Sequence, residues 1–96
     1  MPAYVIADIQ VHDPERYEDY KKLTPGTIVK YGGKFIVRGG QTETLEGAWE
    51  HGRMVMIEFP SMEKAKAWYT SPEYQAAIKI RQEASVGKII LIEGVQ

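Results

Sequence analysis

The sequence predicts a single α+β domain, residues 1–96, in which strands and helices follow the order βαββαβ around an antiparallel sheet. Four segments show the two-residue periodicity of strands. The stretches after the first and third of these segments begin with helix-capping residues and continue with apolar residues at spacings of three and four. A composition of 44% hydrophobic and 26% charged residues is ordinary for a globular chain, so a folded domain is expected.

The first predicted strand runs from Ala3 to Val11, with apolar residues on both of its faces. A helix follows, because Asp13 is a good N-cap and Pro14 suits the first helical position. One face of this helix continues at helical spacing through Tyr17, Tyr20, Thr24, Thr27, Ile28 and Tyr31. Pro25 and Gly26 are expected to kink or break it midway.

A glycine pair at 32–33 ends the helix and a second strand runs from Lys34 to Arg38. The segment 41–52 is ambiguous, since its threonines and Leu45 suit a short strand or the arm of a hairpin. Arg53 to Phe59 is a clear strand, expected to be central in the sheet.

Two short helices are expected after the third strand. Ser61 caps the first, and Ser71 followed by Pro72 starts a second that continues to about Ala84. The last strand is expected from Lys88 to Glu93. The resulting order is the ferredoxin-like one.

The predicted sheet is apolar on both faces, although helices are expected on only one. The even positions alone supply Tyr4, Ile6, Ile36, Met54, Met56, Ile90 and Ile92. A large exposed apolar face usually marks an interface, so we expect a homodimer formed through sheet faces. The alternative is that segment 41–52, with Trp49, covers the sheet of a monomer.

Three polar residues interrupt the even positions of the strands, namely Asp8, Arg38 and Glu58. Since the first and third strands are neighbours in this order, these side chains are expected to converge. The functional interpretation is a polar pocket in which Arg38 orients a small anion and Glu58 or Asp8 acts as a base. The alternative is an arginine–carboxylate bridge of purely structural role, favoured for Asp8.

The third helix carries Arg81 on its core-facing stripe, where a guanidinium must be paired or must bind an anion. The alternative is that Arg81 reaches water at the last turn. Trp68, Tyr69 and Tyr74 are candidates to line an aromatic pocket, together with the tyrosines of the first helix. The alternative for most of these aromatic residues is simple core packing.

Composition and motifs exclude several classes of function. The lack of cysteine excludes thiolate metal sites and cysteine nucleophiles, and His12 and His51 show no ligand spacing, so no metal is expected. The glycine pairs match no nucleotide-binding loop, and no cofactor is expected. Twelve scattered basic residues against thirteen acidic ones disfavour nucleic acid. Without a signal sequence or an apolar run near ~20 residues, no membrane partner and a cytoplasmic location are expected.

Three segments of the chain resemble the DUF1330 family, a bacterial family of unknown function. They are YGGKFIVRGG at 31–40, LEGAW at 45–49 and IEFPSMEKAKAWYTSPEYQ at 57–75, which occur in the family's order and spacing. The resemblance spans nearly the whole chain. It implies membership of the dimeric α/β-barrel superfamily, in which two ferredoxin-like sheets pack face to face.

The resemblance also implies a site in the cleft between sheet and helices. The superfamily includes antibiotic-biosynthesis-type monooxygenases, haem-degrading enzymes, muconolactone isomerases and YciI-like proteins, and haem is not expected here because neither histidine falls in a helix. The candidate pocket residues carried over by motif are Arg38, Glu58, Trp68, Tyr69, Tyr74 and Arg81.

The sequence therefore favours a homodimer that binds a small organic anion between sheet and helices. Two alternatives stay open. One is a cofactor-independent enzyme of monooxygenase, isomerase or lyase type, with Glu58 as the candidate catalytic base. The other is a non-enzymatic accessory dimer with no ligand.

Overall fold

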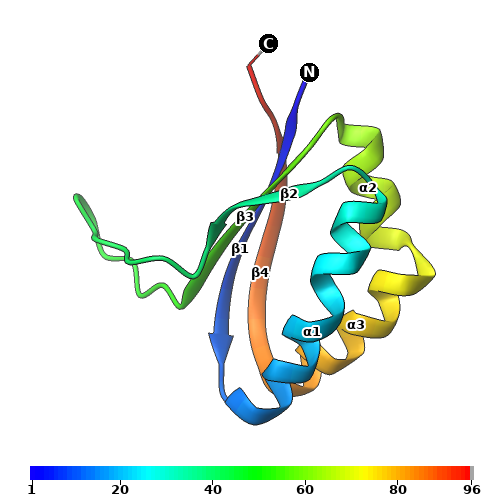
Figure 1. Ribbon diagram of the computed structural model, residues 1–96. Helices are drawn as coiled ribbons and strands as arrows, with labels where there is room; N and C mark the ends of the chain where they lie inside the picture. Colours follow the sequence, from blue (N-terminus) through cyan, green and yellow to red (C-terminus); the bar gives the residue numbers. More distant parts are fainter. Residues whose placement is uncertain (96) are drawn as a thin grey trace.

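The structure, a computed structural model, describes residues 1–95. The elements in chain order are β1 (Ala3–Val11), α1 (Pro14–Lys30), β2 (Lys34–Arg38), β3 (Arg53–Phe59), α2 (Met62–Thr70), α3 (Pro72–Ala84) and β4 (Ser85–Glu93). The strands form one antiparallel sheet in the order β2-β3-β1-β4, and all three helices cover the same face of it (Figure 1). The predicted ferredoxin-like α+β fold is confirmed, with β3 inside the sheet as expected.

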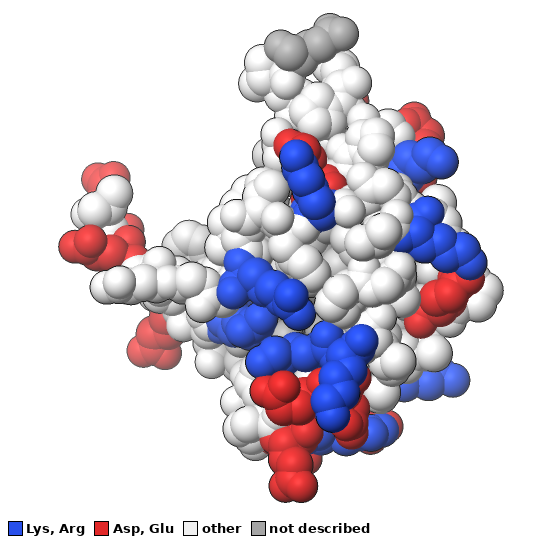
Figure 2. All heavy atoms as spheres, in the orientation of Figure 1, with Lys and Arg blue, Asp and Glu red and all other residues white. Residues whose placement is uncertain are grey.

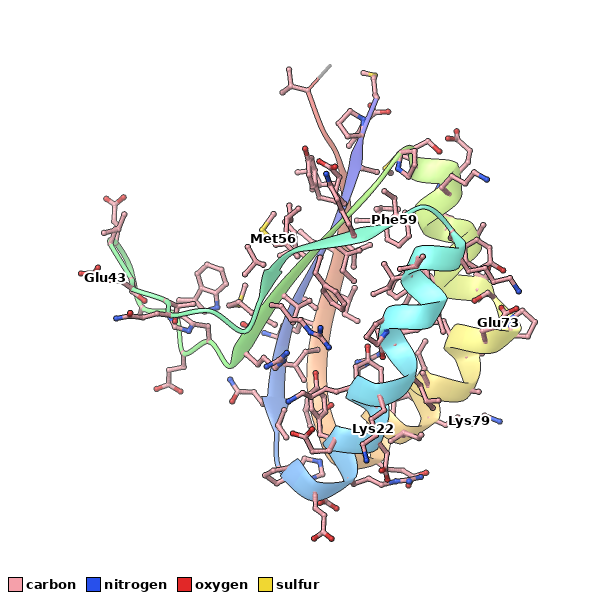
Figure 3. All side chains as sticks on the ribbon, in the orientation of Figure 1. Lys22, Glu43, Met56, Phe59, Glu73 and Lys79 are labelled. Atoms are coloured by element: carbon pink, nitrogen blue, oxygen red, sulfur yellow. The ribbon has the colours of Figure 1, made fainter. Side chains whose placement is uncertain are left out.

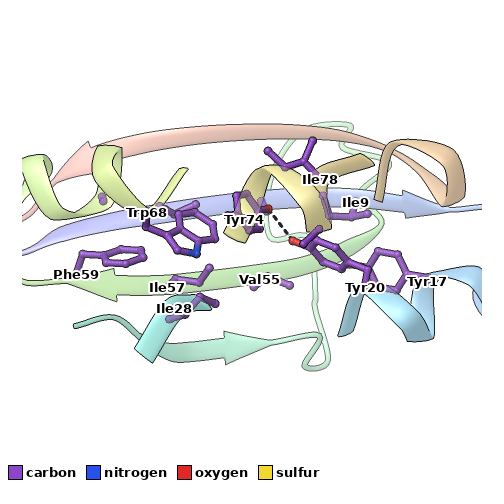
Figure 4. Packing of buried hydrophobic residues seen from close by; sticks show 14 of the residues in the cluster. Ile9, Tyr17, Tyr20, Ile28, Val55, Ile57, Phe59, Trp68, Tyr74 and Ile78 are labelled. Carbon is purple, nitrogen blue, oxygen red and sulfur yellow. Dashed lines mark hydrogen bonds between the residues drawn. The ribbon is translucent and has the colours of Figure 1, made fainter. Parts of the chain in front are cut away.

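The core lies between the helices and the odd-numbered residues of β1 and β3. Trp68, Tyr74, Phe59, Ile9 and Ile28 are its largest fully buried side chains, and Figure 4 shows them packed over the strands. The odd-numbered residues of these strands face the helices, as shown by Val5 and Ile57, which lie opposite each other in the β1–β3 register and are both buried. Alternation along the strands thus decides which residues form the core.

Three details differ from the expectations. Helix α1 continues without a break through Pro25, because buried Tyr20, Thr24 and Ile28 on both sides of the proline hold the two halves against one core. Segment 41–52 forms neither strand nor helix. Strand β4 begins at Ser85, three residues before the expected start, because it pairs with β1 as far as Val11.

Strand β2 contains a bulge that reverses its side-chain parity. Phe35 lies opposite Ile57, whereas Val37 lies opposite Met56, so Ile36 is an extra residue in the ladder. Beyond the bulge, Arg38 lies opposite Val55, whose side chain is buried beneath the helices. Arg38 therefore shares the helix side of the sheet, and the expectation that it shares a face with Glu58 is wrong.

The other side of the sheet, which we call the open face, consists of the even-numbered residues of β1, β3 and β4 together with Ile36 and Val37. No helix covers it, and Ile36, Ile90 and Ile92 keep 44%, 59% and 49% of their surface exposed. Met56 projects to this side while Phe59 projects toward the helices (Figure 3). Segment 41–52 is bonded through Trp49 and Gly52 to Asp8 at one end of the sheet, and its tip extends away from the sheet (Figure 1). It leaves the isoleucines of the open face exposed, so the covered-monomer alternative is not realised.

Gly33 gives a first test of the packing at the end of α1. A Cβ at this position would lie 2.6 Å from Phe59 Cε1 and 2.8 Å from Ile28 Cγ2, both in the core. We expect Gly33→Ala to lower the free energy of unfolding by about 1–3 kcal/mol in urea denaturation. The matched control is Gly26→Ala within α1, where no atom lies within 4 Å and a gain of up to about 1 kcal/mol is expected. Equal stability of the two variants would contradict this packing.

A second test concerns the ion pair between Lys30, at the end of α1, and Glu73, in the first turn of α3. The hydrogen bond from Lys30 lowers the pKa of Glu73 from 4.5 to about 2. Because the folded pKa is the lower one, this stabilisation is present above pH 4.5 and is lost as the pH falls toward 2.

Glu73→Gln should accordingly remove part of the loss of stability between these pH values, measured as thermal unfolding midpoints over an acid series. Glu63→Gln, at the start of α2, is the control, since Glu63 makes no ion pair within residues 1–95. If both variants follow the wild-type pH curve, the Lys30–Glu73 pair does not stabilise the fold in solution.

Candidate functional site

A small cavity lies between the sheet and helix α1, with an interior of about 30 Å³, which is room for roughly two water molecules. We call it the helix-side cavity. Its walls are formed by Val5, Ala7, Ile9, Tyr17, Tyr20, Lys21, Thr24, Phe35, Arg38, Arg53, Val55, Ile57, Trp68, Tyr74 and Ile89. Every strand and every helix supplies at least one of these residues, from the face that its periodicity turns inward.

Aromatic side chains with satisfied polar atoms form the inner wall. The Tyr20 and Tyr74 hydroxyl oxygens lie 2.7 Å apart in a buried hydrogen bond, drawn in Figure 4. The Trp68 ring lies against Tyr74 with centroids 4.0 Å apart, and its Nε1 donates to Thr27 Oγ1 at 3.0 Å. These contacts fix the aromatic rings, so the inner wall is rigid and mostly apolar.

Burial also fixes the protonation state of two of these phenols. It raises the pKa of Tyr17 and of Tyr74, and the nearby arginines, Arg53 and then Arg81 for Tyr17 and Arg81 for Tyr74, only partly offset the rise. Both side chains are therefore neutral at physiological pH. They can donate or accept a hydrogen bond but carry no negative charge toward the cavity.

The outer end of the cavity is cationic. Lys21, Arg38 and Arg53 line it, and Figure 2 shows basic side chains gathered on the surface between the sheet and α1. Lys21 is paired with Glu18 on its own helix at 2.9 Å, whereas Arg38 lies over the Phe35 ring, with Cζ 4.4 Å from the centroid. Among the residues that the structure describes, no Asp, Glu or His lines the cavity.

Arg53 is held more firmly than Arg38. Its Nε is buried and has no hydrogen-bond acceptor in residues 1–95. Its Cζ lies 6.0 Å from the centroid of the Tyr17 ring, and the guanidinium packs against the backbone of Gly39. Arg53 therefore presents donors without a carboxylate to receive them.

Arg81 is buried as predicted from its place on the core stripe, with 6% of its surface exposed. The alternative that it reaches water is therefore wrong. Its Nε has no acceptor, and it makes no ion pair within the described chain. It does not line the cavity, but its charge acts on Tyr17 and Tyr74, which do. Arg81 adds positive potential behind the aromatic wall.

Glu58 and Asp8 lie on the open face, on the far side of the sheet from the helix-side cavity. Glu58 pairs with Lys34 of β2 at 3.4 Å. Asp8 accepts hydrogen bonds from Gly52 N at 2.7 Å and from Trp49 Nε1 at 3.0 Å, and these bonds hold its pKa below the usual value. Asp8 thus anchors segment 41–52 to β1, the structural role favoured for it, and the expected convergence of both carboxylates with Arg38 is wrong.

The remaining candidates divide between two places. Trp68 and Tyr74 line the helix-side cavity, as described. Tyr69 instead lines a separate, shallower hollow of about 320 Å³ between α2 and β4, together with Lys66 and Ile90. The ring of Tyr69 is near that of Tyr74, with centroids 5.8 Å apart, although the two residues line different hollows.

Sequence reasoning missed Arg53 and Lys21. Arg53 has the parity of Val55 and Ile57, so its position on the helix side was readable from strand alternation. Lys21 lies four residues after Tyr17, on the inner face of α1, and was readable from helical spacing. The polar candidates on the strands were taken from even-numbered positions, which leaves out Arg53, and no charged residue of the first helix was considered, which leaves out Lys21.

The described residues offer no other obvious chemical centre. No group of three or more potential His, Asp or Glu metal ligands is present in residues 1–95. Within the same range, no helix has the length and apolar character to cross a membrane.

Comparison with solved structures supports the fold. A protein of unknown function from Rhodopseudomonas palustris superposes with a TM-score of 0.80 at 20% identity, over 99% of this chain and 83% of that one. A dimeric ferredoxin-like protein of unknown function from Jannaschia sp. gives 0.73 at 11% identity, over 98% and 100% of the two chains. SnoaB, a cofactor-independent oxygenase from Streptomyces nogalater, gives 0.67 at 13% identity, over 99% and 94%.

Comparison by sequence identifies the family. A search of curated proteins finds no match. Residues 2–95 match the family described as Domain of unknown function (DUF1330), and this match covers nearly all of the chain. The chain therefore belongs to the DUF1330 family.

Proposed function

We propose that this domain is a homodimer that binds a small organic anion in the helix-side cavity of each protomer. One observation carries the ligand proposal: Arg38 and Arg53, with Lys21, line a cavity whose other walls are mainly apolar and aromatic, and no carboxylate of the described residues lines it. A guanidinium at such a place is stabilised by an anion that brings its own charge. The cavity walls supply the apolar contact that a small ligand needs.

Binding is favoured over catalysis by the chemistry of the lining. The hydroxyls of Tyr20 and Tyr74 are hydrogen-bonded to each other, and the described residues that line the cavity include no histidine or carboxylate to act as a base. Glu58, the candidate base, is on the open face. A cofactor-independent oxygenase, the activity printed for SnoaB, is the alternative, and oxygen consumption during incubation with a bound acid would support it.

The homodimer proposal rests on the open face. Its exposed isoleucines extend across β2 and β4, and no segment of residues 1–95 covers them. Structurally similar proteins are described as dimeric ferredoxin-like proteins. A second copy presenting the same face would remove this apolar surface from water.

The ligand proposal predicts selective binding of a carboxylate. We expect butyrate to shift the Trp68 indole N–H signal in an NMR titration, and butyramide, its neutral analogue, to leave it unchanged. Because Arg38 is exposed, Arg38→Gln should weaken butyrate binding only about two- to fivefold. Arg16→Gln is the control, since Arg16 is already paired with Asp19 and Glu83. An equal response to butyrate and butyramide would refute an anion site.

The dimer proposal predicts a mass of about twice 10.9 kDa by light scattering. A charge in the middle of the open face should separate the protomers, so Ile6→Lys is expected to elute as a monomer with a native circular dichroism spectrum. Val29→Lys, on the exposed side of α1, should stay dimeric. A wild-type protein that is monomeric at micromolar concentration would rule the proposal out.

A further inference from the structure

We propose that Arg53, packed against Gly39, is the residue that selects the ligand, and that the ligand is a short-chain carboxylic acid held by the terminal nitrogens of the Arg53 guanidinium. This inference rests on the proposed function and deepens it. It concerns which cation recognises the anion and what chemical group that cation requires.

Gly39 makes the position of Arg53 possible. Its φ of +68° belongs to the left-handed region, and a Cβ there would collide with the Arg53 guanidinium, lying 2.9 Å from Cζ. Gly39 N also donates to Met54 O at 2.8 Å, which ties the end of β2 to the residue after Arg53. Gly39 therefore has two roles: it adopts the left-handed backbone conformation after β2, and its missing side chain leaves space for the Arg53 guanidinium.

The packing of the guanidinium against Gly39 limits which of its N–H donors a ligand can reach. The side of the guanidinium that carries Nη1 packs on Gly39, the Tyr17 ring lies to another side, and Nε is enclosed by the protein. Because Arg53 lines the cavity, its terminal nitrogens are the donors that a ligand can meet, and they form strong charge-assisted hydrogen bonds with a carboxylate. Lysine, a point charge, cannot reproduce this geometry.

The size of the cavity limits the rest of the ligand. An interior of about 30 Å³ with Ile57, Trp68 and Tyr74 in its wall accepts a few apolar carbon atoms and excludes a large ring system. With the carboxylate at the cationic end, the short apolar chain would lie against these residues. With the carboxylate at the mouth of the cavity, an interior that holds roughly two water molecules has room for a chain of about two or three carbon atoms, as in propionate or butyrate.

The first experiment titrates the ¹⁵N-labelled protein with butyrate and follows the arginine Nε–H signals. We expect the Arg53 signal to shift while that of Arg16 does not. Arg53→Lys should weaken butyrate binding by about tenfold or more, whereas Arg38→Lys should change it by no more than about twofold. If Arg53→Lys binds as the wild type does, the inference is wrong although the cavity still binds an anion.

The second experiment displaces the guanidinium without removing it. Gly39→Ala should weaken butyrate binding to a similar extent as Arg53→Lys. Gly47→Ala is the matched control, because Gly47 has a φ of +80° but a Cβ added there would meet no atom within 4 Å, so this variant reports backbone strain alone. Folding of each variant is checked by its amide spectrum.

The outcomes separate the two proposals. If wild-type protein does not respond to butyrate, propionate or benzoate, the proposed function fails together with this inference. Tighter binding of benzoate than of butyrate would overturn the assigned ligand class. Unchanged binding in Gly39→Ala, with Arg53→Lys impaired, would show that Gly39 does not position Arg53.

Discussion

The alternation of side chains along the strands, with its interruption at Ile36, decides what each polar residue of this domain can reach. Odd-numbered residues of β1 and β3 face the helices, and even-numbered residues form the open face. The bulge in β2 moves Arg38 from the second group to the first. Without it, Arg38 would lie on the open face, as Lys34 and Glu58 do, and the helix-side cavity would lose one of its cations.

The arginines of the chain fall into two groups, those paired with carboxylates at the surface and those at the helix-side cavity. Arg16 is paired with two carboxylates at the surface, while Arg38, Arg53 and Arg81 make no ion pair within residues 1–95. All three lie in or behind the wall of one cavity. Burial of an unpaired charge is unfavourable, and the two buried Nε groups, of Arg53 and Arg81, have no acceptor within residues 1–95. The open face lies on the other side of the sheet and takes no part in lining this cavity.

Most of the fold was predictable because its signals are local. Strand alternation, the caps at Asp13, Ser61 and Ser71, and the glycine pair after α1 place all four strands and three helices within a few residues. The continuity of α1 through Pro25 was not predictable, because packing on both sides of the proline outweighs the loss of one helical hydrogen bond.

The site was predictable only in part. The burial of Arg81, Trp68 and Tyr74 followed from helical spacing. The separation of Arg38 from Glu58 did not, since a bulge is a property of strand pairing and leaves no mark in the periodicity of a five-residue strand. Arg53 shares the parity of its buried neighbours, and its seat on Gly39 needed the folded backbone to be seen.

A crystal structure of the protein with butyrate tests the central claim most directly. We expect the butyrate carboxylate within hydrogen-bond distance of a terminal guanidinium nitrogen of Arg53, with the alkyl chain against Trp68 and Tyr74. A carboxylate from the second protomer bonded to the Arg53 guanidinium, or butyrate bound elsewhere with the helix-side cavity unchanged, would contradict it.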